Sequence, residues 1–369
     1  IECLTMHLKL VTYFFERVCK NIMKKFPVGK LPPDLLDELL KSYPVSDPRI
    51  VIGPGIGVDA TVIDFGERYL VAKTDPVTFA TQEIGWYAVN VNANDIATMG
   101  ATPRWFLASV LLPEGKTDEA LVKEIFQDIT RAADELGVTL CGGHTEITYG
   151  LDRPIVVGQM LGEVEKEKLV VSTNVEVGDD IILTKGIAIE GTALIALEKG
   201  EELSRDYGWE FVKQAQKLLH DPGISVVRDA LLANSVTKVH AMHDPTEGGL
   251  ATGLWEIAKL TDKGLMVNLD MVHCFKETMM VCERYGIDPV GLIASGSLLI
   301  VCAPSDSVKV LDTLRRNNIS CEVIGSITTP HPTLPPEGGG MGWGGIKAIK
   351  KGKVVEFPLF KVDEIAKIL

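Results

Sequence analysis

The sequence predicts a protein of two successive domains, of the α/β and α+β classes. Short apolar, strand-like runs alternate with helix-length segments in both halves of the chain. A charged and polar stretch at residues 163–177 separates the two halves. The length of 369 residues is sufficient for two domains. We expect a helical extension at 1–45, domains at 46–165 and 176–330, and a loop and tail at 331–369.

The first half opens with a helix over residues 31–43, where Pro32 and Pro33 suit a helix start and the leucines form an apolar side. Strand-like runs follow at 49–53, 60–66 and 69–75. A helix is expected over 81–100, with Gly100 at its C-terminal end. The remaining expected elements of this half are a strand at 104–113, an amphipathic helix at 117–137, and strands at 138–143 and 155–164.

The second half repeats this mixture of strands and helices. Strands are expected at 179–186, 264–270, 296–304 and 320–327, and helices at 191–200, 209–219, 249–260 and 306–318. The glycine-rich stretch at 335–345 is expected to be a loop.

The composition of the chain disfavours some classes of function. The formal net charge of −13 disfavours binding to nucleic acid, which requires Lys and Arg to neutralise phosphates. No uncharged apolar run reaches the length of a membrane span. The seven cysteines include no C-x-x-C pair, and we interpret them as structural thiols of a cytoplasmic protein.

The first 22 residues carry an apolar stripe, with Leu4, Leu8, Val11, Phe15, Val18 and Ile22 at helical spacing. The stripe is consistent with a docking or dimerising helix. Translation from an upstream start is the alternative that we favour, since the sequence from Met23 resembles a natural beginning.

Several carboxylates stand where an apolar run meets a turn: Asp59, Asp75, Asp95, Glu146, Asp244 and Glu247. Hard cations such as Mg²⁺ prefer carboxylate and phosphate oxygens, so the set is a candidate metal site if the fold brings its members together. Each acid taken singly is equally explained as a cap or turn residue.

Two glycine-containing segments are candidates for contact with an anion. In CGGHTEI (141–147), Gly142 and Gly143 precede His144 and Glu146, which we expect in a loop at a strand end. Gly248 and Gly249 open the helix expected at 249–260, and the free N–H groups of a helix start favour phosphate oxygens. No Walker-type loop and no G-x-S-x-G elbow occur. Among the histidines, His144 is the candidate, whereas His240 and His243 are interpreted as structural.

A set of motifs, taken in order along the chain, resembles that of a known superfamily. The motifs are G-V-D-A (57–60), K-T-D-P (73–76), N-D-I-A-T-M-G-A-T-P (94–103), G-G-H-T-E (142–146) and D-P-T-E-G-G-L-A (244–251). Its members are aminoimidazole ribonucleotide (AIR) synthetase, selenophosphate synthetase, thiamine monophosphate kinase and the hydrogenase maturation factor HypE. The resemblance covers residues 45–330 and is greatest to HypE. It implies the two-domain PurM-like fold, and a homodimer formed through the N-terminal sheets.

The resemblance also implies ATP and Mg²⁺ as cofactors. Metal or phosphate would be held by Asp59, Asp75 and Asp95, and the nucleotide by Asn94, Gly142, Gly143, Thr145, Asp244, Gly248 and Gly249. Lys73 would pair with a phosphate or with Glu146. Glu146 or His144 would act as a base or an added ligand.

The sequence departs from the HypE pattern at three places. It ends in DEIAKIL without a terminal cysteine, Glu146 stands where a lysine is expected, and Ala294, Ser295 and Gly296 replace an N-E-G motif. Dehydration of a carbamoyl group on its own tail is therefore not expected. We expect an ATP-dependent enzyme acting on a small-molecule substrate. The alternatives are a catalytically altered nucleotide-binding partner in a maturation pathway, and a kinase of the thiamine monophosphate kinase type.

Overall fold

The structure is a computed structural model that describes residues 26, 29, 31–42, 44–55, 57–78, 80–330, 345–358 and 360–369. Residues 1–44 and 45–369 form two separate compact units. In the first unit, helix α2 (Pro33–Ser42) confirms the helix expected at 31–43. The apolar stripe of the first 22 residues lies outside the described residues, as does the glycine-rich stretch apart from Gly345.

The first sheet of residues 45–369 is mixed, as expected. Its strands are β1 (Ile50–Ile52), β2 (Thr61–Asp64), β3 (Arg68–Val77), β4 (Thr102–Pro113), β5 (Thr139–Thr148) and β6 (Ile155–Glu165). Their spatial order is β1-β2-β3-β6-β4-β5. β4 and β5 run parallel, and every other neighbouring pair in this sheet is antiparallel.

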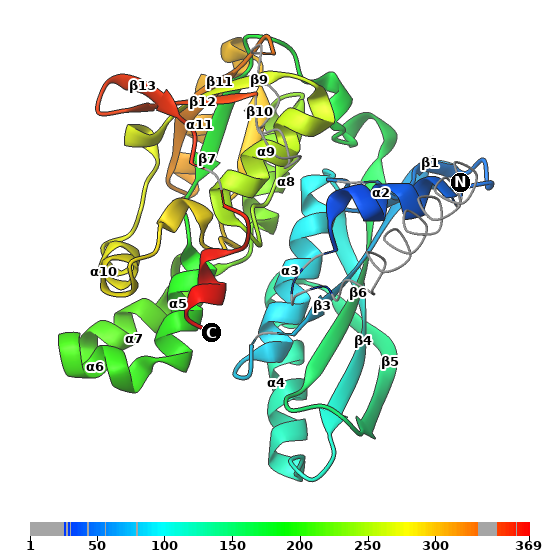
Figure 1. The fold of residues 1–369 in the computed structure, drawn as a ribbon. Helices are drawn as coiled ribbons and strands as arrows, with labels where there is room; N and C mark the ends of the chain where they lie inside the picture. Colours follow the sequence, from blue (N-terminus) through cyan, green and yellow to red (C-terminus); the bar gives the residue numbers. More distant parts are fainter. Residues whose placement is uncertain are drawn as a thin grey trace, which may run out of the picture. The chain divides into compact units, whose positions relative to one another are not determined.

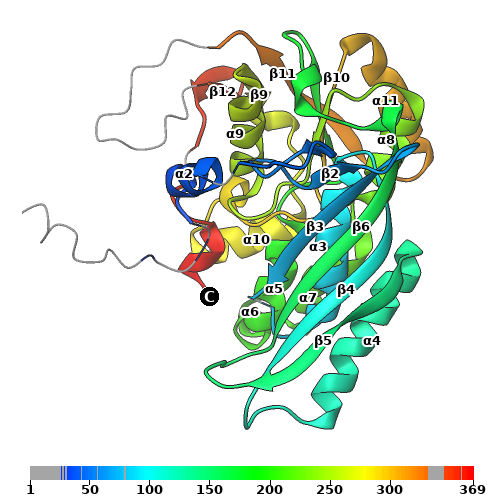
Figure 2. The ribbon, with the colours of Figure 1, turned by 90° about the vertical axis from the view of Figure 1, so that its right-hand side faces the viewer.

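Helices α3 (Ile84–Thr98) and α4 (Glu119–Leu136) lie on one face of this sheet (Figures 1 and 2). The burial of alternate strand residues such as Val71 and Phe106 reflects this one-sided packing. The Asp118 side chain accepts a hydrogen bond from the Leu121 N–H at the start of α4, and Gly137 ends the helix at a φ of 64°. α3 is buried on nearly all sides, because it lies between this sheet and the second half of the chain.

The second sheet has seven strands. They are β7 (Asp180–Thr184), β8 (Ala241–His243), β9 (Gly264–Asn268), β10 (Leu299–Cys302), β11 (Cys321–Thr328), β12 (Ile346–Lys350) and β13 (Lys353–Glu356). The spatial order is β13-β12-β9-β11-β7-β10-β8. The strands expected from sequence correspond to β7, β9, β10 and β11, whereas β8, β12 and β13 were not predicted.

The helices of the second half are α5 (Ile189–Glu198), α6 (Gly200–Tyr207), α7 (Trp209–Lys217), α8 (Val227–Val236), α9 (Gly249–Thr261), α10 (Lys276–Tyr285) and α11 (Pro304–Arg316). Short helical turns lie at Lys166–Lys168, Ser172–Asn174, Leu219–Gly223, Leu269–Met271, Pro289–Gly291 and Glu364–Lys367. Among the described residues, no helix combines the length and the apolar character that a membrane crossing requires.

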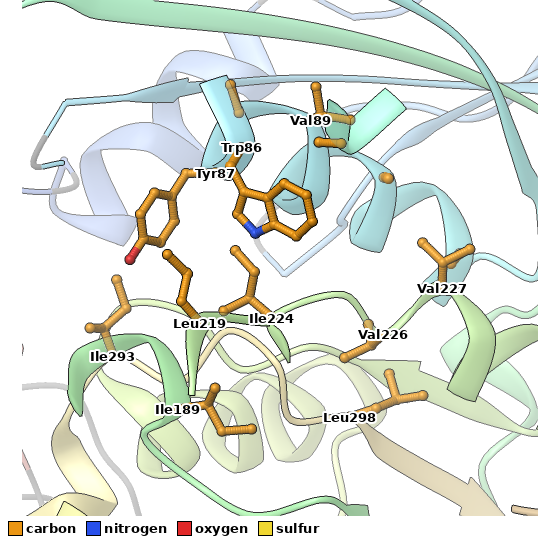
Figure 3. Close-up of a cluster of buried hydrophobic side chains, with 14 of the residues drawn as sticks. Trp86, Tyr87, Val89, Ile189, Leu219, Ile224, Val226, Val227, Ile293 and Leu298 are labelled. Carbon is orange, nitrogen blue, oxygen red and sulfur yellow. The ribbon is translucent and has the colours of Figure 1, made fainter. Parts of the chain in front are cut away.

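The two halves meet along α3. In Figure 3 the side chains of Trp86 and Tyr87 face Leu219 and Ile224 in a shared apolar cluster. Beside this cluster, the Asn94 side chain donates to the carbonyl of Ile224 at 2.9 Å and accepts from the Val226 N–H at 2.8 Å. These contacts fix the position of α3, and therefore of Asp95, the residue that follows Asn94.

Candidate functional site

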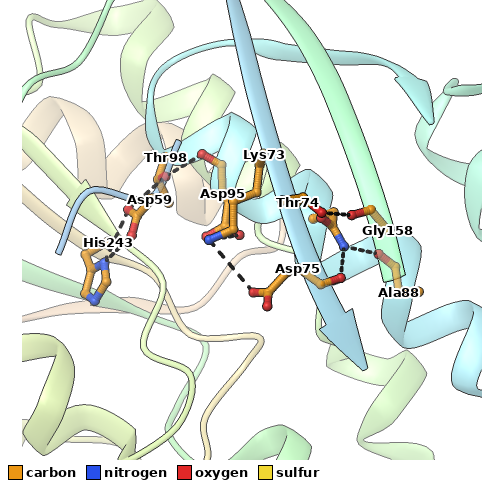
Figure 4. Close-up of polar contacts among 10 residues, drawn as sticks. Asp59, Lys73, Thr74, Asp75, Ala88, Asp95, Thr98, Gly158 and His243 are labelled. Carbon is orange, nitrogen blue, oxygen red and sulfur yellow. Dashed lines mark hydrogen bonds and ion pairs between the residues drawn. The ribbon is translucent and has the colours of Figure 1, made fainter. Parts of the chain in front are cut away.

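Four charged side chains from three segments form the first part of the candidate site (Figure 4). Asp59 lies just before β2, Lys73 and Asp75 lie on β3, and Asp95 lies on α3. Lys73 and Asp75 share the strand face of the buried Val71, because side chains alternate along a strand. That face lies toward α3, and the Lys73 Nζ is 3.1 Å from an Asp95 carboxylate oxygen and 3.8 Å from one of Asp75.

The second half of the chain contributes His243 from the end of β8. Its Nδ1 lies 3.3 Å from the Asp59 carboxylate, and its Nε2 lies 2.7 Å from Glu256 on α9. The Thr98 hydroxyl donates to Asp59 from the other side at 3.2 Å. His243, which the sequence analysis interprets as structural, thus lies within the acidic cluster.

Asp244 completes the cluster and has the most unusual environment. Its side chain is 1% exposed, and neither carboxylate oxygen has a hydrogen-bond partner. Among the described residues, Asp59, His243 and Asp244 offer ligand atoms that all lie within 4.8 Å of one another. The two carboxylates are donors for a divalent cation, whereas both imidazole nitrogens of His243 are engaged with Asp59 and Glu256.

The pKa shifts show that the acids outnumber the bases at this place. Burial raises the pKa of Asp244 well above its ordinary value, and the charges of Asp95 and Asp59 raise it further. Burial likewise raises the pKa of Asp95 to about 7, against the opposing effect of the Lys73 ammonium. A bound cation would relieve this repulsion and satisfy the unpartnered oxygens of Asp244, so the residues fit a metal ion.

Asp59 has a lowered pKa, whereas the two basic groups have raised pKa values. Burial acts to raise the pKa of Asp59, but His243 and Lys73 hold it below its ordinary value. Burial acts to lower the pKa of His243, but Asp59 and Glu256 raise it well above the usual range. Lys73 also has a raised pKa, because the attraction of Asp95 and Asp75 outweighs the effect of burial. Lys73 is therefore a permanent positive charge among carboxylates.

The segment CGGHTEI is not the strand-end loop that we expected. It lies inside β5, an edge strand separated from β3 by β6 and β4. The structure therefore does not bring His144, Thr145 and Glu146 to the acidic cluster of the same chain. His144 and Glu146 are exposed and 3.1 Å apart, so Glu146 is paired with His144 rather than with Lys73.

The glycines of this segment have a local structural role. Gly143 has a φ of 152°, and a Cβ there would lie 2.1 Å from the carbonyl oxygen of Ala108 on β4. The pairing of β4 with β5 shifts its register between Phe106 and Leu107. Glycine is thus required at position 143 because the backbone of the neighbouring strand β4 lies so close.

The start of α9 does hold an anionic group, but the group belongs to the chain itself. The Gly248 N–H donates to the carboxylate of Asp363 at 2.6 Å, and the Ile293 N–H donates to its other oxygen at 3.2 Å. Gly249 has a φ of 62°, and a Cβ there would lie 2.5 Å from the Leu292 carbonyl oxygen. This helix start is therefore adapted to an oxyanion, as expected, and is closed by the C-terminal segment.

Asn94 is the remaining residue for which a nucleotide contact was implied. Both of its polar side-chain atoms are engaged with residues 224 and 226. In the structure it therefore positions α3. Sequence reasoning also missed Glu256, because no recognisable motif surrounds it. The H-D-P order at His243 and Asp244 was the one signal that placed an imidazole directly before a candidate ligand.

The chain matches two models of one protein family in succession. Residues 57–164 match the N-terminal domain of AIR synthase related protein, and residues 176–334 match its C-terminal domain. A putative hydrogenase expression/formation protein of Methanocaldococcus jannaschii is 28% identical over 315 residues, which are 82% of this chain and 89% of that protein. The carbamoyl dehydratase HypE of Cupriavidus necator is 28% identical over 263 residues, which are 70% of this chain and 72% of HypE.

A solved structure has the same fold. The structure of hydrogenase maturation protein HypE in complex with ATP aligns with a TM-score of 0.62 and 21% sequence identity. The alignment covers 88% of this chain and 91% of that one. The two-domain PurM-like fold expected from the motifs is thereby confirmed.

Proposed function

Because this chain belongs to the family of AIR synthase related proteins, we propose that it is an enzyme dependent on ATP and Mg²⁺. The observation that supports this most strongly is Asp244. A buried carboxylate with two unpartnered oxygens, beside Asp59 and His243, is costly to the folded protein unless a cation binds it. A HypE structure of the same fold is described as a complex with ATP, which supports a nucleotide as the companion of that cation.

The proposed roles follow from the geometry of the cluster. Asp59 and Asp244 would hold Mg²⁺, with Asp95 and Asp75 near enough to bind metal-bound water or a second ion. Bound Mg²⁺ neutralises charge on phosphate oxygens during phosphoryl transfer. Lys73, fixed between Asp95 and Asp75, would attract the nucleotide phosphates. His243 is held between Asp59 and Glu256, and would keep Asp59 oriented toward the ion.

The reaction that we propose is activation of an oxygen atom of a small substrate by phosphorylation, or transfer of phosphate to it outright. Both require the same metal and phosphate site. They differ in whether the phosphorylated species leaves the protein or reacts further on it.

The proposal includes a homodimer formed through the first sheet. Trp105, Leu107 and Leu111 on β4 share the sheet face opposite α3 and α4, because the alternate residues of that strand are buried against the helices. Trp105 is 36% exposed, which is unusual for so large an apolar side chain. Ser109 pairs with His144 and Leu111 with Glu146, which places both polar residues on this same face. They would then lie at the subunit interface.

A nucleotide-binding partner protein without catalytic activity is the second candidate. It is supported by the description of the Methanocaldococcus jannaschii relative as a hydrogenase expression/formation protein. The acidic cluster fits both candidates, because a protein that only binds nucleotide would also use a cation at the phosphates; turnover separates them.

Nucleotide turnover tests the proposal. Purified protein would be incubated with ATP, with and without Mg²⁺, and the products separated as ADP and AMP. We expect slow, Mg²⁺-dependent ADP formation that disappears in Asp59→Asn and Asp244→Asn variants. Turnover that survives both substitutions would contradict the site assignment. ATP binding without any turnover would favour the partner-protein function.

A further inference from the structure

A second buried acid lies outside the metal cluster, on the first turn of α5. Glu190 is 8% exposed, and its Oε2 atom has no hydrogen-bond partner. In the described part of the chain, no Lys or Arg forms an ion pair with it. An ionisable group in this environment is costly unless a ligand completes it.

Two further polar atoms share this condition and converge on the same place. The Ser295 hydroxyl is buried next to the Glu190 carboxylate without a hydrogen bond of regular geometry, and the hydroxyl of Tyr87 is buried without a partner. The Gly191 N–H, one residue after Glu190, donates to the Ile293 carbonyl at 3.1 Å, which brings the start of α5 against the segment that contains Ser295. In Figure 3 the Tyr87 hydroxyl points toward Ile293 of this same segment.

The electrostatics agree with this convergence. Burial raises the pKa of Glu190 to about 7, the nearby Ser295 opposes the rise, and the charges of Asp363 and Glu247 add to it. Burial also raises the pKa of Tyr87, and the Glu190 carboxylate is the largest of the charges that raise it further. The surroundings of Glu190 are thus strongly negative.

The cluster adjoins the proposed metal site through the loop that begins at Asp244. The Ala294 N–H, next to Ser295, donates to the carbonyl of Thr246 at 3.2 Å. Only Pro245 therefore lies between Asp244 and the residue that contacts the segment of Ser295. A molecule bound at Glu190 would lie beside a nucleotide bound at Asp59 and Asp244.

We propose that Glu190, Ser295 and Tyr87 bind the second substrate of the reaction, and that this substrate is a small organic cation with N–H donors, of the amine, amidine or guanidine class. The assignment rests on the proposed function, since it identifies the part of the same site that would hold the second substrate beside the nucleotide. A carboxylate and two hydroxyl oxygens can each accept a hydrogen bond from such a group.

Other occupants fit less well. An anion would be repelled by Glu190, Glu247 and Asp363. A bare metal ion requires tightly convergent ligand atoms, and among the described residues that arrangement belongs to Asp59, His243 and Asp244. A buried water would satisfy part of the hydrogen bonding but would leave the negative charge of Glu190 uncompensated.

Binding of methylguanidinium to the full chain tests the proposal, because this probe keeps its charge at every accessible pH. Saturation-transfer NMR on its methyl protons would be recorded over a titration, with methylurea as the neutral probe of similar shape. We expect methylguanidinium to bind and methylurea to bind at least about tenfold more weakly, the factor expected for a hydrogen bond to a charged group. Glu190→Gln should remove this preference, and Ser295→Ala should weaken methylguanidinium binding.

Glu198→Gln is the matched control, because Glu198 lies on the same helix, is exposed, and accepts a hydrogen bond from Thr81 at 2.7 Å. It should leave methylguanidinium binding unchanged. Equal binding of the two probes, or an unchanged preference in Glu190→Gln, would overturn the proposal. Binding of Mg²⁺ and ATP is measured separately on each variant. Its absence from the wild type would count against the proposed function, whatever the probes show.

Discussion

Replacement of Asp244 by Asn should have opposite effects on stability with and without ligand. In the ligand-free protein the substitution removes a buried carboxyl group whose pKa is raised by burial and by the charges of Asp95 and Asp59, so that the folded protein opposes its ionisation. Asn cannot ionise, so the variant avoids this cost, which is about 1.4 kcal/mol for each unit by which folding raises the pKa; we expect the free energy of unfolding to rise by at least this amount at neutral pH. At roughly 2–4 °C per kcal/mol, the melting temperature should rise by several degrees.

Addition of Mg²⁺ and ATP should reverse the order of the two proteins. A ligand at about one hundred times its Kd stabilises the folded state by about 2.7 kcal/mol, and this gain should appear in the wild type alone. Differential scanning calorimetry on both proteins, with and without ligand, would measure all four melting temperatures. Asp179→Asn is the control, because Asp179 is also buried but is partnered by His240 and the Glu176 N–H, each at 2.7 Å.

Asp179→Asn should lower stability and keep the gain from Mg²⁺ and ATP. The reasoning would be refuted if Asp244→Asn destabilised the ligand-free protein as Asp179→Asn does. It would also be refuted if the Asp244 variant gained as much from Mg²⁺ and ATP as the wild type.

Three further predictions concern other parts of the molecule. Lys185→Met leaves Asp229, which lies 3.5 Å from the Lys185 Nζ, as an unpaired buried charge. Urea denaturation should show a free energy of unfolding lower by about 3–5 kcal/mol. The added substitution Asp229→Asn should recover part of this loss. Gly143→Ala places a methyl group against the Ala108 carbonyl, so it should distort β5 and weaken the dimer in light scattering; an unchanged dimer would contradict the interface. Glu190→Gln should raise the free energy of unfolding by about 3 kcal/mol at pH 8 and by little at pH 4. The pKa of Glu190 is about 7 in the folded protein and 4.5 ordinarily, so the wild type loses stability as the pH rises between these two values. A difference between the two proteins that does not depend on pH would contradict this.

The sequence was sufficient to predict the helices and strands whose apolar residues recur in a strong local pattern. The amphipathic pattern before Gly137 predicted α4, and the apolar run at 69–75 predicted the centre of β3. Strand β8 was missed because it has only three residues, β12 because lysines interrupt its apolar residues, and β13 because it lies exposed at a sheet edge. Their strand conformation depends on pairing with distant neighbours rather than on a pattern of their own.

The candidate site was predictable only in part, for the same reason. The acids Asp59, Asp95 and Asp244 stand in local contexts that indicated a cation site. The contact of His243 with Asp59 joins residues 184 positions apart, and that of Asp363 with Gly248 joins residues 115 apart. No local spacing carries such information, because the first contact forms only when the two halves of the chain pack together, and the second only when the C-terminal segment lies against the start of α9.

The central claim is that Asp59 and Asp244 bind Mg²⁺ together with ATP. Isothermal titration calorimetry with a non-hydrolysable ATP analogue tests it most directly, because the result does not depend on the second substrate. The account predicts one nucleotide per chain, bound only when Mg²⁺ is present, lost in Asp244→Asn and kept in Asp179→Asn. Binding that needs no divalent cation, or that survives the Asp244 substitution unchanged, would contradict it.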